Sequence, residues 1–223
     1  MREIVLDTET TGLDPAAGHR IVEVACLELR NHVPSGVNFQ TYVNPQREMP
    51  EEAYRVHGLS TGFLAEHPPF AEVAAKLLDF IGEAPLVIHN AEFDLRFLNH
   101  ELTLLEHPPL DPARAVDTLA LARRRFPGAQ VNLDALCKRF EIDNSARDLH
   151  GALLDCELLA EVYLELRGGR QPGFELGSDE RAAVTATTGE RPVRPARPHA
   201  PSEQEAAAHA AMRAKLKDPI WDA

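Results

Sequence analysis

The sequence of 223 residues lacks the features that mark membrane, exported and disulfide-bonded proteins. No apolar run is long enough to span a bilayer, and no secretory signal pattern follows the first residues, so we expect no membrane association. Cysteine is scarce: the three cysteines are widely spaced and form no Cys-x-x-Cys pair. This pattern excludes a disulfide scaffold and a paired-cysteine zinc site, and it predicts a protein of the reducing cytoplasm.

Signature motifs of several common chemistries are missing too. The sequence has no glycine-rich P-loop and no GxGxxG motif for phosphate binding, and no G-x-S-x-G motif of a serine hydrolase. An excess of basic residues is also lacking, because residues 1–170 hold 16 Lys and Arg against 27 Asp and Glu, a net charge of −11. This balance excludes a simple electrostatic coat for DNA. It still permits nucleic-acid binding through carboxylate-held divalent metals, which invert the local charge.

A nearly continuous apolar periodicity runs through the sequence up to about residue 168. Three strands come first and are followed by strands that alternate with helices, an order that predicts an α/β domain with a mixed sheet covered by helices. The predicted strands are residues 2–8, 20–30, 33–43, 84–90 and 112–116. The predicted helices are residues 69–82, 93–106, 117–125, 132–140 and 151–167.

Composition changes after this domain. Residues 169–201 are rich in Gly, Pro, Thr and Arg and have few large apolar side chains, so they read as a flexible linker. Residues 202–223 begin with Ser202 and Glu205 at the spacing of a capping box, continue with an Ala-rich run and reach Asp218-Pro219, which stops a helix. We therefore expect three parts: a domain at 1–168, a linker at 169–201 and a helical tail at 202–223.

The tail ends with Ile220 and Trp221, and Trp221 is the only tryptophan of the chain. Tryptophan is enriched among the residues that dominate binding interfaces, so this pair favours a partner-binding tail. The alternative is that the tail folds back on its own domain.

The segment IVLDTETTG places Asp7 and Glu9 at the end of an apolar strand. Side chains alternate along a strand with period two, so both carboxylates lie on the same face. Two like charges side by side repel each other and resist desolvation. We therefore expect a counter-charge at this strand end.

Three further polar residues stand in apolar surroundings. Asp94 falls in the first turn of a predicted helix, and Asp155 interrupts the apolar stripe of another. His150 precedes Asp155 by five residues, and within one helix this spacing would separate the two side chains by about 140°. His150 can therefore act with Asp155 only from a position before the helix, where Gly151 permits an irregular backbone. Taken singly, each of these residues could be a solvated surface residue or a helix cap.

Together these residues match the needs of phosphodiester hydrolysis. Mg²⁺ prefers oxygen ligands and usually binds through a few carboxylates together with substrate phosphate. Two such ions clamp the attacking and leaving oxygens, and an unliganded His can act near pH 7 as a general base.

The segments DTETTG, HNAEFDLRFL and HGALLDCELLAEVY resemble the three motifs of the DEDD-type 3′→5′ exonucleases, in the variant whose fifth residue is His (DEDDh). In detail, residues 2–168 are similar to the proofreading (epsilon) subunits of bacterial DNA polymerase III. The Ala-rich tail with a Trp near its end is similar to theirs as well.

This resemblance implies an RNase H-like fold, with a five-stranded mixed sheet flanked by helices on both faces and a flexible C-terminal tail. It implies that four carboxylates hold two Mg²⁺ or Mn²⁺ ions, namely Asp7, Glu9, Asp94 and Asp155. His150 would be the general base. The substrate-binding residues would be Asp7, Glu9, Thr10, Thr11, Gly12, Glu52, His57, Asn90, Phe93 and Asp155.

The resemblance further implies a metal-dependent 3′→5′ exonuclease that removes misincorporated 3′-terminal nucleotides from DNA and releases nucleoside 5′-monophosphates. Its partners would be the single-stranded 3′ end and, through Ile220 and Trp221, the polymerase (alpha) subunit of the cytoplasmic, nucleoid-associated replisome. The sliding clamp would bind Gln171, Phe174 and Leu176, although Pro172 and Gly173 depart from the family's clamp-binding pattern. The alternatives are a related exonuclease that trims RNA 3′ ends and a non-catalytic scaffold that only binds the polymerase.

Overall fold

The computed structural model describes residues 1–145, 149–169 and 200–215. The chain divides into two units, within residues Met1–Leu176 and Gly177–Ala223, and each is described by itself. Several expectations lie outside the described residues: nearly all of the linker, the proposed clamp-binding residues Gln171, Phe174 and Leu176, and the end of the tail with Ile220 and Trp221.

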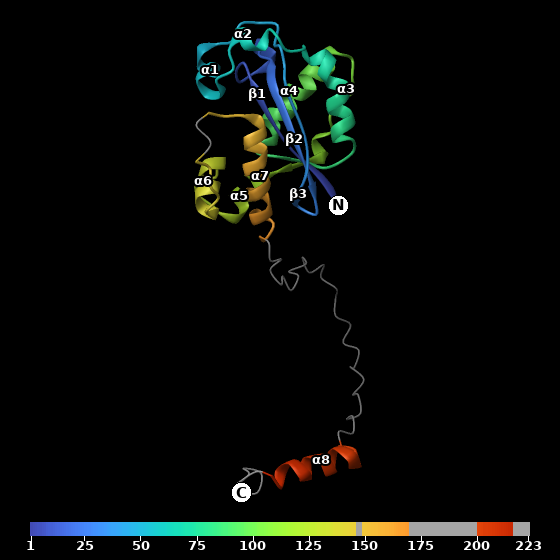
Figure 1. The fold of residues 1–223 in the computed structure, drawn as a ribbon. Coiled ribbons are helices and arrows are strands. Elements are labelled where there is room, and N and C mark those ends of the chain that lie inside the picture. Colours follow the sequence, from blue (N-terminus) through green and yellow to red (C-terminus); the bar gives the residue numbers. More distant parts are fainter. Residues whose placement is uncertain (146–148, 170–199, 216–223) are drawn as a thin grey trace, which may run out of the picture. The chain divides into compact units, whose positions relative to one another are not determined.

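The first unit is built on a five-stranded mixed sheet with the strand order β3-β2-β1-β4-β5 (Figure 1). The pairs β1–β2 and β2–β3 are antiparallel, whereas β1–β4 and β4–β5 are parallel. The strands are β1 (Arg2–Thr10), β2 (Ile21–Arg30), β3 (Val33–Tyr42), β4 (Leu86–Ile88) and β5 (Ala115–Asp117). This arrangement confirms the predicted sheet.

Helices cover both faces of the sheet. The predicted helices are confirmed with small shifts, and α3 and α4 share one apolar core with the sheet while α5, α6 and α7 share the other. Two short helices, α1 and α2, were not predicted. The helices of this unit are α1 (Glu51–His57), α2 (Thr61–Leu64), α3 (Phe70–Ile81), α4 (Ala91–Leu104), α5 (Thr118–Arg125), α6 (Leu133–Phe140) and α7 (Ala152–Leu166), with 3₁₀ turns η1 (Pro15–Ala17) and η2 (Pro112–Arg114).

The last strand lies slightly later than expected. Residues 112–114 form the turn η2 instead, because Asp111 caps it by accepting a hydrogen bond from the Ala113 N–H, and Pro112 occupies its first position. The strand β5 therefore begins only at Ala115.

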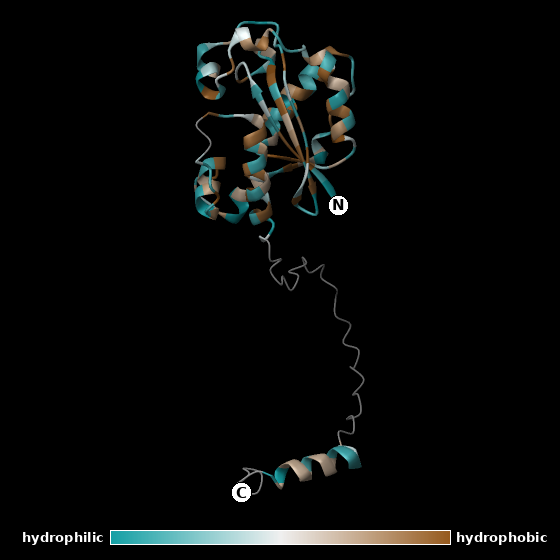
Figure 2. Cartoon of the chain, in the orientation of Figure 1, coloured by the Kyte–Doolittle hydropathy of each residue, from teal (hydrophilic) through white to brown (hydrophobic). Residues whose placement is uncertain are grey.

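Strand β1 divides its side chains between the two cores. Ile4 and Leu6 belong to the core under α3 and α4, while Val5 belongs to the core under α7. Figure 2 shows the apolar residues of the strands (brown) in the middle of the domain and polar residues (teal) on the outer sides of the helices. The same alternation continues to the end of the strand, so Asp7 and Glu9 face α7, whereas Thr8 faces α4.

In the second unit, α8 (Glu203–Arg213) begins with the predicted capping box. The Ser202 hydroxyl accepts a hydrogen bond from the Glu205 N–H, and the Glu205 carboxylate accepts one from the Ser202 N–H. The expected stop at Asp218 lies outside the described residues. Within the described ranges, no helix of the chain has the length and apolar character needed to cross a membrane.

Candidate active site

The paired carboxylates of β1 lie where this strand leaves the sheet. Asp7 stands opposite Ala25 of β2 and Glu9 opposite Glu23, and the register shifts immediately after Glu9. Glu9 is 8% exposed. The strand therefore delivers two carboxylates to the α7 side of the sheet, as their spacing predicts.

Asp94 reaches the same end of the sheet from the first turn of α4. It is buried, and its carboxylate accepts a hydrogen bond of 2.7 Å from the Thr8 hydroxyl. The turn before α4 places Asn90 in the left-handed region with φ +66°, and its N–H donates to the Asp117 carboxylate. Asn90 thus stands at the helix entry rather than at the centre of the carboxylates.

His150 and Asp155 meet at the N-terminal end of α7. His150 precedes the helix, as the spacing requires, and its Nδ1 lies 3.3 Å from a buried carboxylate oxygen of Asp155. About half of the His150 side chain is exposed. The expected role of Gly151 is wrong: its φ of −146° is extended backbone that any residue adopts.

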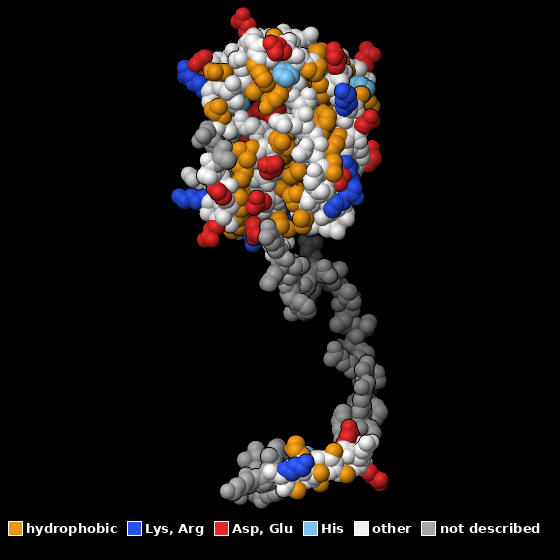
Figure 3. Space-filling model, viewed as in Figure 1, with side chains coloured by type: hydrophobic (Ala, Val, Ile, Leu, Met, Phe, Trp, Pro, Cys, Tyr) orange, Lys and Arg blue, Asp and Glu red, His pale blue; other side chains and the backbone are white. Residues whose placement is uncertain are grey.

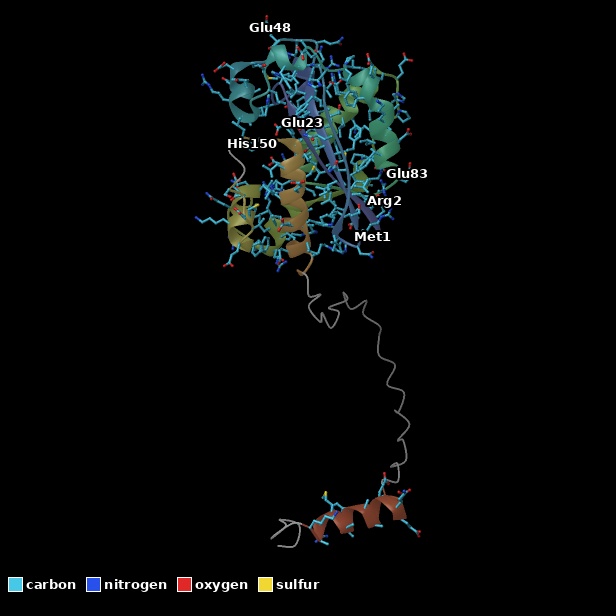
Figure 4. The ribbon with its side chains drawn as sticks, in the orientation of Figure 1. Met1, Arg2, Glu23, Glu48, Glu83 and His150 are labelled. Atoms are coloured by element: carbon cyan, nitrogen blue, oxygen red, sulfur yellow. The ribbon has the colours of Figure 1, made fainter. Side chains whose placement is uncertain are left out.

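These groups form a cluster of oxygen and nitrogen donors. Three donor atoms, one from each of Glu9, His150 and Asp155, lie within 4.8 Å of one another. Asp7 lies near enough to these groups to feel their charges. Its pKa is raised first by burial and then by the charges of Asp94, Glu9, Asp155 and Glu23. Figure 4 shows Glu23 and His150 at the same end of α7.

Burial also raises the pKa of Asp94, to about 7, although the hydrogen bond from Thr8 opposes the shift. Carboxylates that raise one another's pKa need a positive charge to stay ionised together. Hard oxygen donors of this kind fit a divalent cation such as Mg²⁺ or Mn²⁺. The described residues therefore fit a divalent-metal site.

A cavity of about 490 Å³ opens next to the cluster. The helix α1 forms one wall of the cavity, and the turn that follows β1 forms another. Seven of the residues predicted to bind substrate line it: Glu9, Thr10, Thr11, Gly12, Glu52, His57 and Phe93. Asp7, Asn90 and Asp155 do not line this cavity.

Gly12 makes a close approach in the cavity wall. A Cβ built on Gly12 would lie 2.3 Å from the His19 ring, so a larger residue would force this ring to move. The Nδ1 atom of His19 is in turn 3.2 Å from the Thr11 hydroxyl, and the Thr10 hydroxyl donates to the Gly12 carbonyl. These contacts fix the turn after β1 and present its backbone to the cavity.

His57 closes the cavity from the end of α1. Its side chain is buried, and its Nδ1 accepts a hydrogen bond from the Leu59 N–H. Burial lowers the His57 pKa, a hydrogen bond with Thr10 opposes the shift, and the charge of His150 lowers it further. The neutral form is therefore favoured.

Sequence reasoning missed Glu23, a buried carboxylate beside the cluster. It accepts hydrogen bonds from the Gln40 side chain at 2.7 Å and from the Ala152 N–H at 3.2 Å, and burial raises its pKa. Through Ala152, Glu23 anchors the first turn of α7 and so helps to place Asp155. Its signal in the sequence was an acid near the start of β2, with apolar residues on both sides of it.

Comparisons with known proteins show to which family the chain is similar. A family model described as "Exonuclease" matches residues 4–163. The chain is 57% identical to the DNA polymerase III subunit epsilon of Rickettsia felis over 179 residues, which cover 79% of this chain and 78% of that protein. It is 44% identical to the subunit epsilon of Escherichia coli over 221 residues, which cover 94% of this chain and 91% of that protein.

The chain belongs to the DEDDh family of 3′→5′ exonucleases, among the DNA polymerase III epsilon subunits.

Solved structures show the same fold. Exonuclease X, solved in complex with 5′ overhanging duplex DNA, is 26% identical with a TM-score of 0.57, and the match covers 74% of this chain and 90% of that one. Exonuclease I is 18% identical with a TM-score of 0.65, over 77% of this chain and 41% of that one, which shows the fold alone. As an epsilon-type DEDDh exonuclease, the chain is a proofreading nuclease that depends on divalent metal ions.

Proposed function

We propose that the chain hydrolyses the 3′-terminal phosphodiester of DNA at the carboxylate cluster, with His150 as the general base. The observation that carries this proposal is the group of Glu9, His150 and Asp155 within 4.8 Å, beside a cavity of about 490 Å³. The position of Asp7 and Asp94 near this group supports the full set of four carboxylates.

The metal ligands that we propose are Asp7, Glu9, Asp94 and Asp155. Two Mg²⁺ or Mn²⁺ ions, when bound, would stabilise the charge that develops on the phosphodiester oxygens and favour deprotonation of water. The raised pKa of Asp94, about 7, supports this assignment, because a cation would restore its ionised form at neutral pH.

His150 acts on the attacking water. Its Nδ1 faces Asp155 at 3.3 Å, so the carboxylate orients the ring and leaves proton transfer to Nε2. The water oxygen bonds to phosphorus, its proton passes to Nε2, and the bond from phosphorus to the 3′ oxygen of the preceding nucleotide breaks. The products are a nucleoside 5′-monophosphate and a shortened strand whose 3′ oxygen takes up a proton.

The terminal nucleotide binds in the cavity. The backbone at Thr10, Thr11 and Gly12 forms one side, and Glu52 and His57 from α1 form the other. Phe93 adds an aromatic face, while Asn90 shapes the entry of α4. An unpaired end enters such a cavity more readily than a paired one, because unpairing costs a few kcal/mol and costs least at a mismatch.

The test is digestion of 5′-labelled oligonucleotides in Mg²⁺ or Mn²⁺. We expect a mismatched primer end to be degraded faster than a matched end, and DNA faster than RNA of the same sequence. His150→Ala should lower turnover about 10²–10⁴-fold. A preference for RNA would favour the RNA-trimming alternative, and full turnover in His150→Ala would contradict the assignment of the base.

We also propose the three-part organisation, with the exonuclease domain at 1–168, the linker at 169–201 and the tail at 202–223. In this proposal the tail binds the polymerase alpha subunit, Gln171, Phe174 and Leu176 bind the sliding clamp, and the chain works at the cytoplasmic replisome. The support is similarity to relatives named as DNA polymerase III subunits, which covers 94% of this chain in one case.

Deletion of residues 202–223 tests the tail. We expect unchanged digestion of free oligonucleotides and loss of co-elution with the polymerase subunit. Unchanged co-elution would contradict the proposed role of the tail and favour a tail that folds back on its own domain.

A further inference from the structure

The backbone next to His150 is held by the end of α1. The His150 N–H donates a hydrogen bond of 3.0 Å to the Val56 carbonyl. Val56 also lines the cavity, together with its neighbour His57. One short helix therefore forms a wall of the cavity and anchors the segment that carries the proposed base.

A second contact lies beside this hydrogen bond. A Cβ built on Gly58 would lie 2.7 Å from Leu149 Cδ1, so the Leu149 side chain rests directly on the Gly58 backbone. Gly58 also ends α1 in the left-handed region with φ +74°, and its N–H donates to the Tyr54 carbonyl. The positive φ favours glycine at this position, and a side chain there would push the Leu149 side chain away.

Leu149 lies outside the two apolar cores. Its side chain is 50% exposed, and it belongs to neither of the two core clusters. A half-exposed leucine contributes little to global stability, so its packing on Gly58 has its main effect on the local chain. The residue that follows Leu149 in this chain is His150.

We propose that Leu149 and Gly58 are positioning residues that hold His150 against Asp155. This inference rests on the proposed role of His150 as the general base. Without the contact between Leu149 and Gly58, the segment before α7 loses one of its attachments to the end of α1. The imidazole then spends less time within reach of both Asp155 and the attacking water. Misplacement of a catalytic group by about 1 Å can cost about 10²-fold in rate.

The experiment compares Leu149→Ala with wild type on a single-stranded oligonucleotide. We expect kcat to fall about 10- to 100-fold and KM to stay within about twofold, because the cavity is untouched. Leu149→Met, which keeps the contact with Gly58, should retain most of the activity. The matched control is Leu104→Ala, which removes another exposed leucine, 57% exposed, at the end of α4; it should leave kcat unchanged.

A double-mutant cycle with His150→Ala separates positioning from a general structural role. If Leu149 acts through His150, Leu149→Ala should change kcat by less than about twofold in the His150→Ala background. Amide exchange of His150, measured by NMR, should be faster in Leu149→Ala, whereas amides of the β1–β2 ladder should keep their rates.

Three results would overturn the inference. These are an unchanged kcat in Leu149→Ala, an equal fall of kcat in both backgrounds, and an unchanged His150 amide. An unchanged kcat in Leu149→Ala leaves the base assignment intact as long as His150→Ala is slow. Full activity in His150→Ala, by contrast, contradicts the proposed function itself.

Discussion

Buried carboxylates lie in two regions of this domain, and their neighbours differ. Away from the active site, Glu28 pairs with Arg2 at 2.5 Å and with Arg30 at 2.9 Å, and these hydrogen bonds lower its pKa to about 2. At the active site, burial and neighbouring carboxylates raise the pKa of Asp7. Figure 4 shows the two regions at opposite ends of the sheet, with Arg2 at one end and His150 at the other.

Glu101 extends the comparison. It is 2% exposed, and the Arg20 guanidinium binds both of its oxygens, at 2.7 and 2.6 Å. The sequence thus encodes a cation for Glu28 and for Glu101, whereas every charged group that shifts the pKa of Asp7 is a carboxylate. The difference indicates that the cation of the active site comes from solution.

The distribution of charge on the surface is consistent with a cation that comes from solution. Asp and Glu side chains (red) are spread over the face of the domain seen in Figure 3, so the protein offers no broad basic surface there to hold a nucleic-acid backbone. On this face, therefore, no basic patch attracts an anionic strand.

The largest expected effect comes from removing a carboxylate of the active site. Asp7→Asn should abolish metal-dependent exonuclease activity and raise the free energy of unfolding of the metal-free protein by about 0.5–2 kcal/mol, because it removes one of the repelling charges. Oligonucleotide digestion and chemical denaturation measure the two changes. Asp79→Asn, at an exposed acid of α3, is the matched control. Retained activity in Asp7→Asn would contradict the metal-site assignment.

The next largest effect comes from removing the cation that pairs with a buried carboxylate. Arg20→Met should lower the free energy of unfolding by about 2–4 kcal/mol, because it leaves the buried Glu101 without its cation. The double variant with Glu101→Leu should recover most of this loss, since the buried charge is then gone. Urea denaturation at pH 7 measures both. A loss below about 0.5 kcal/mol in the single variant would show that the buried Glu101 does not depend on the cation of Arg20.

The most gradual effect is a pH dependence of the metal-free protein. Asp94 has a pKa of about 7 in the native state, well above its ordinary value, so the native state holds a proton there that the unfolded chain releases. The free energy of unfolding should therefore fall as pH rises towards 7, by at most about 1.4 kcal/mol per pH unit from this group, and level off above it.

Asp94→Asn isolates this contribution, because asparagine can still accept the hydrogen bond from Thr8. The difference in pH slope between wild type and Asp94→Asn, measured by denaturation without metal, should carry the sign given above. Equal slopes would mean that Asp94 is already ionised in the metal-free site.

The sequence predicted the parts of the fold that depend on local pattern. The alternation of IVLDTET placed Asp7 and Glu9 on one face of β1, and the angle between positions 150 and 155 required His150 to stand before its helix. The cavity-lining residues, by contrast, were expected only through the family resemblance.

The short helices α1 and α2 carried too weak a pattern to predict. Each buries a single residue, His57 in α1 and Leu64 in α2, so neither shows the apolar stripe of a core helix. Glu23 and the contact between Leu149 and Gly58 depend on pairing between segments far apart in the chain. No local periodicity encodes such pairings.

The measurement that tests the central claim most directly is thermal unfolding during titration with Mg²⁺ or Mn²⁺. A cation supplied from solution should raise the Tm of the wild-type protein over the same concentration range that activates digestion. The stabilisation should be about 2.7 kcal/mol at a hundredfold excess over Kd, and it should be much smaller in Asp7→Asn. A wild-type Tm that does not move at metal concentrations giving full activity would contradict the account.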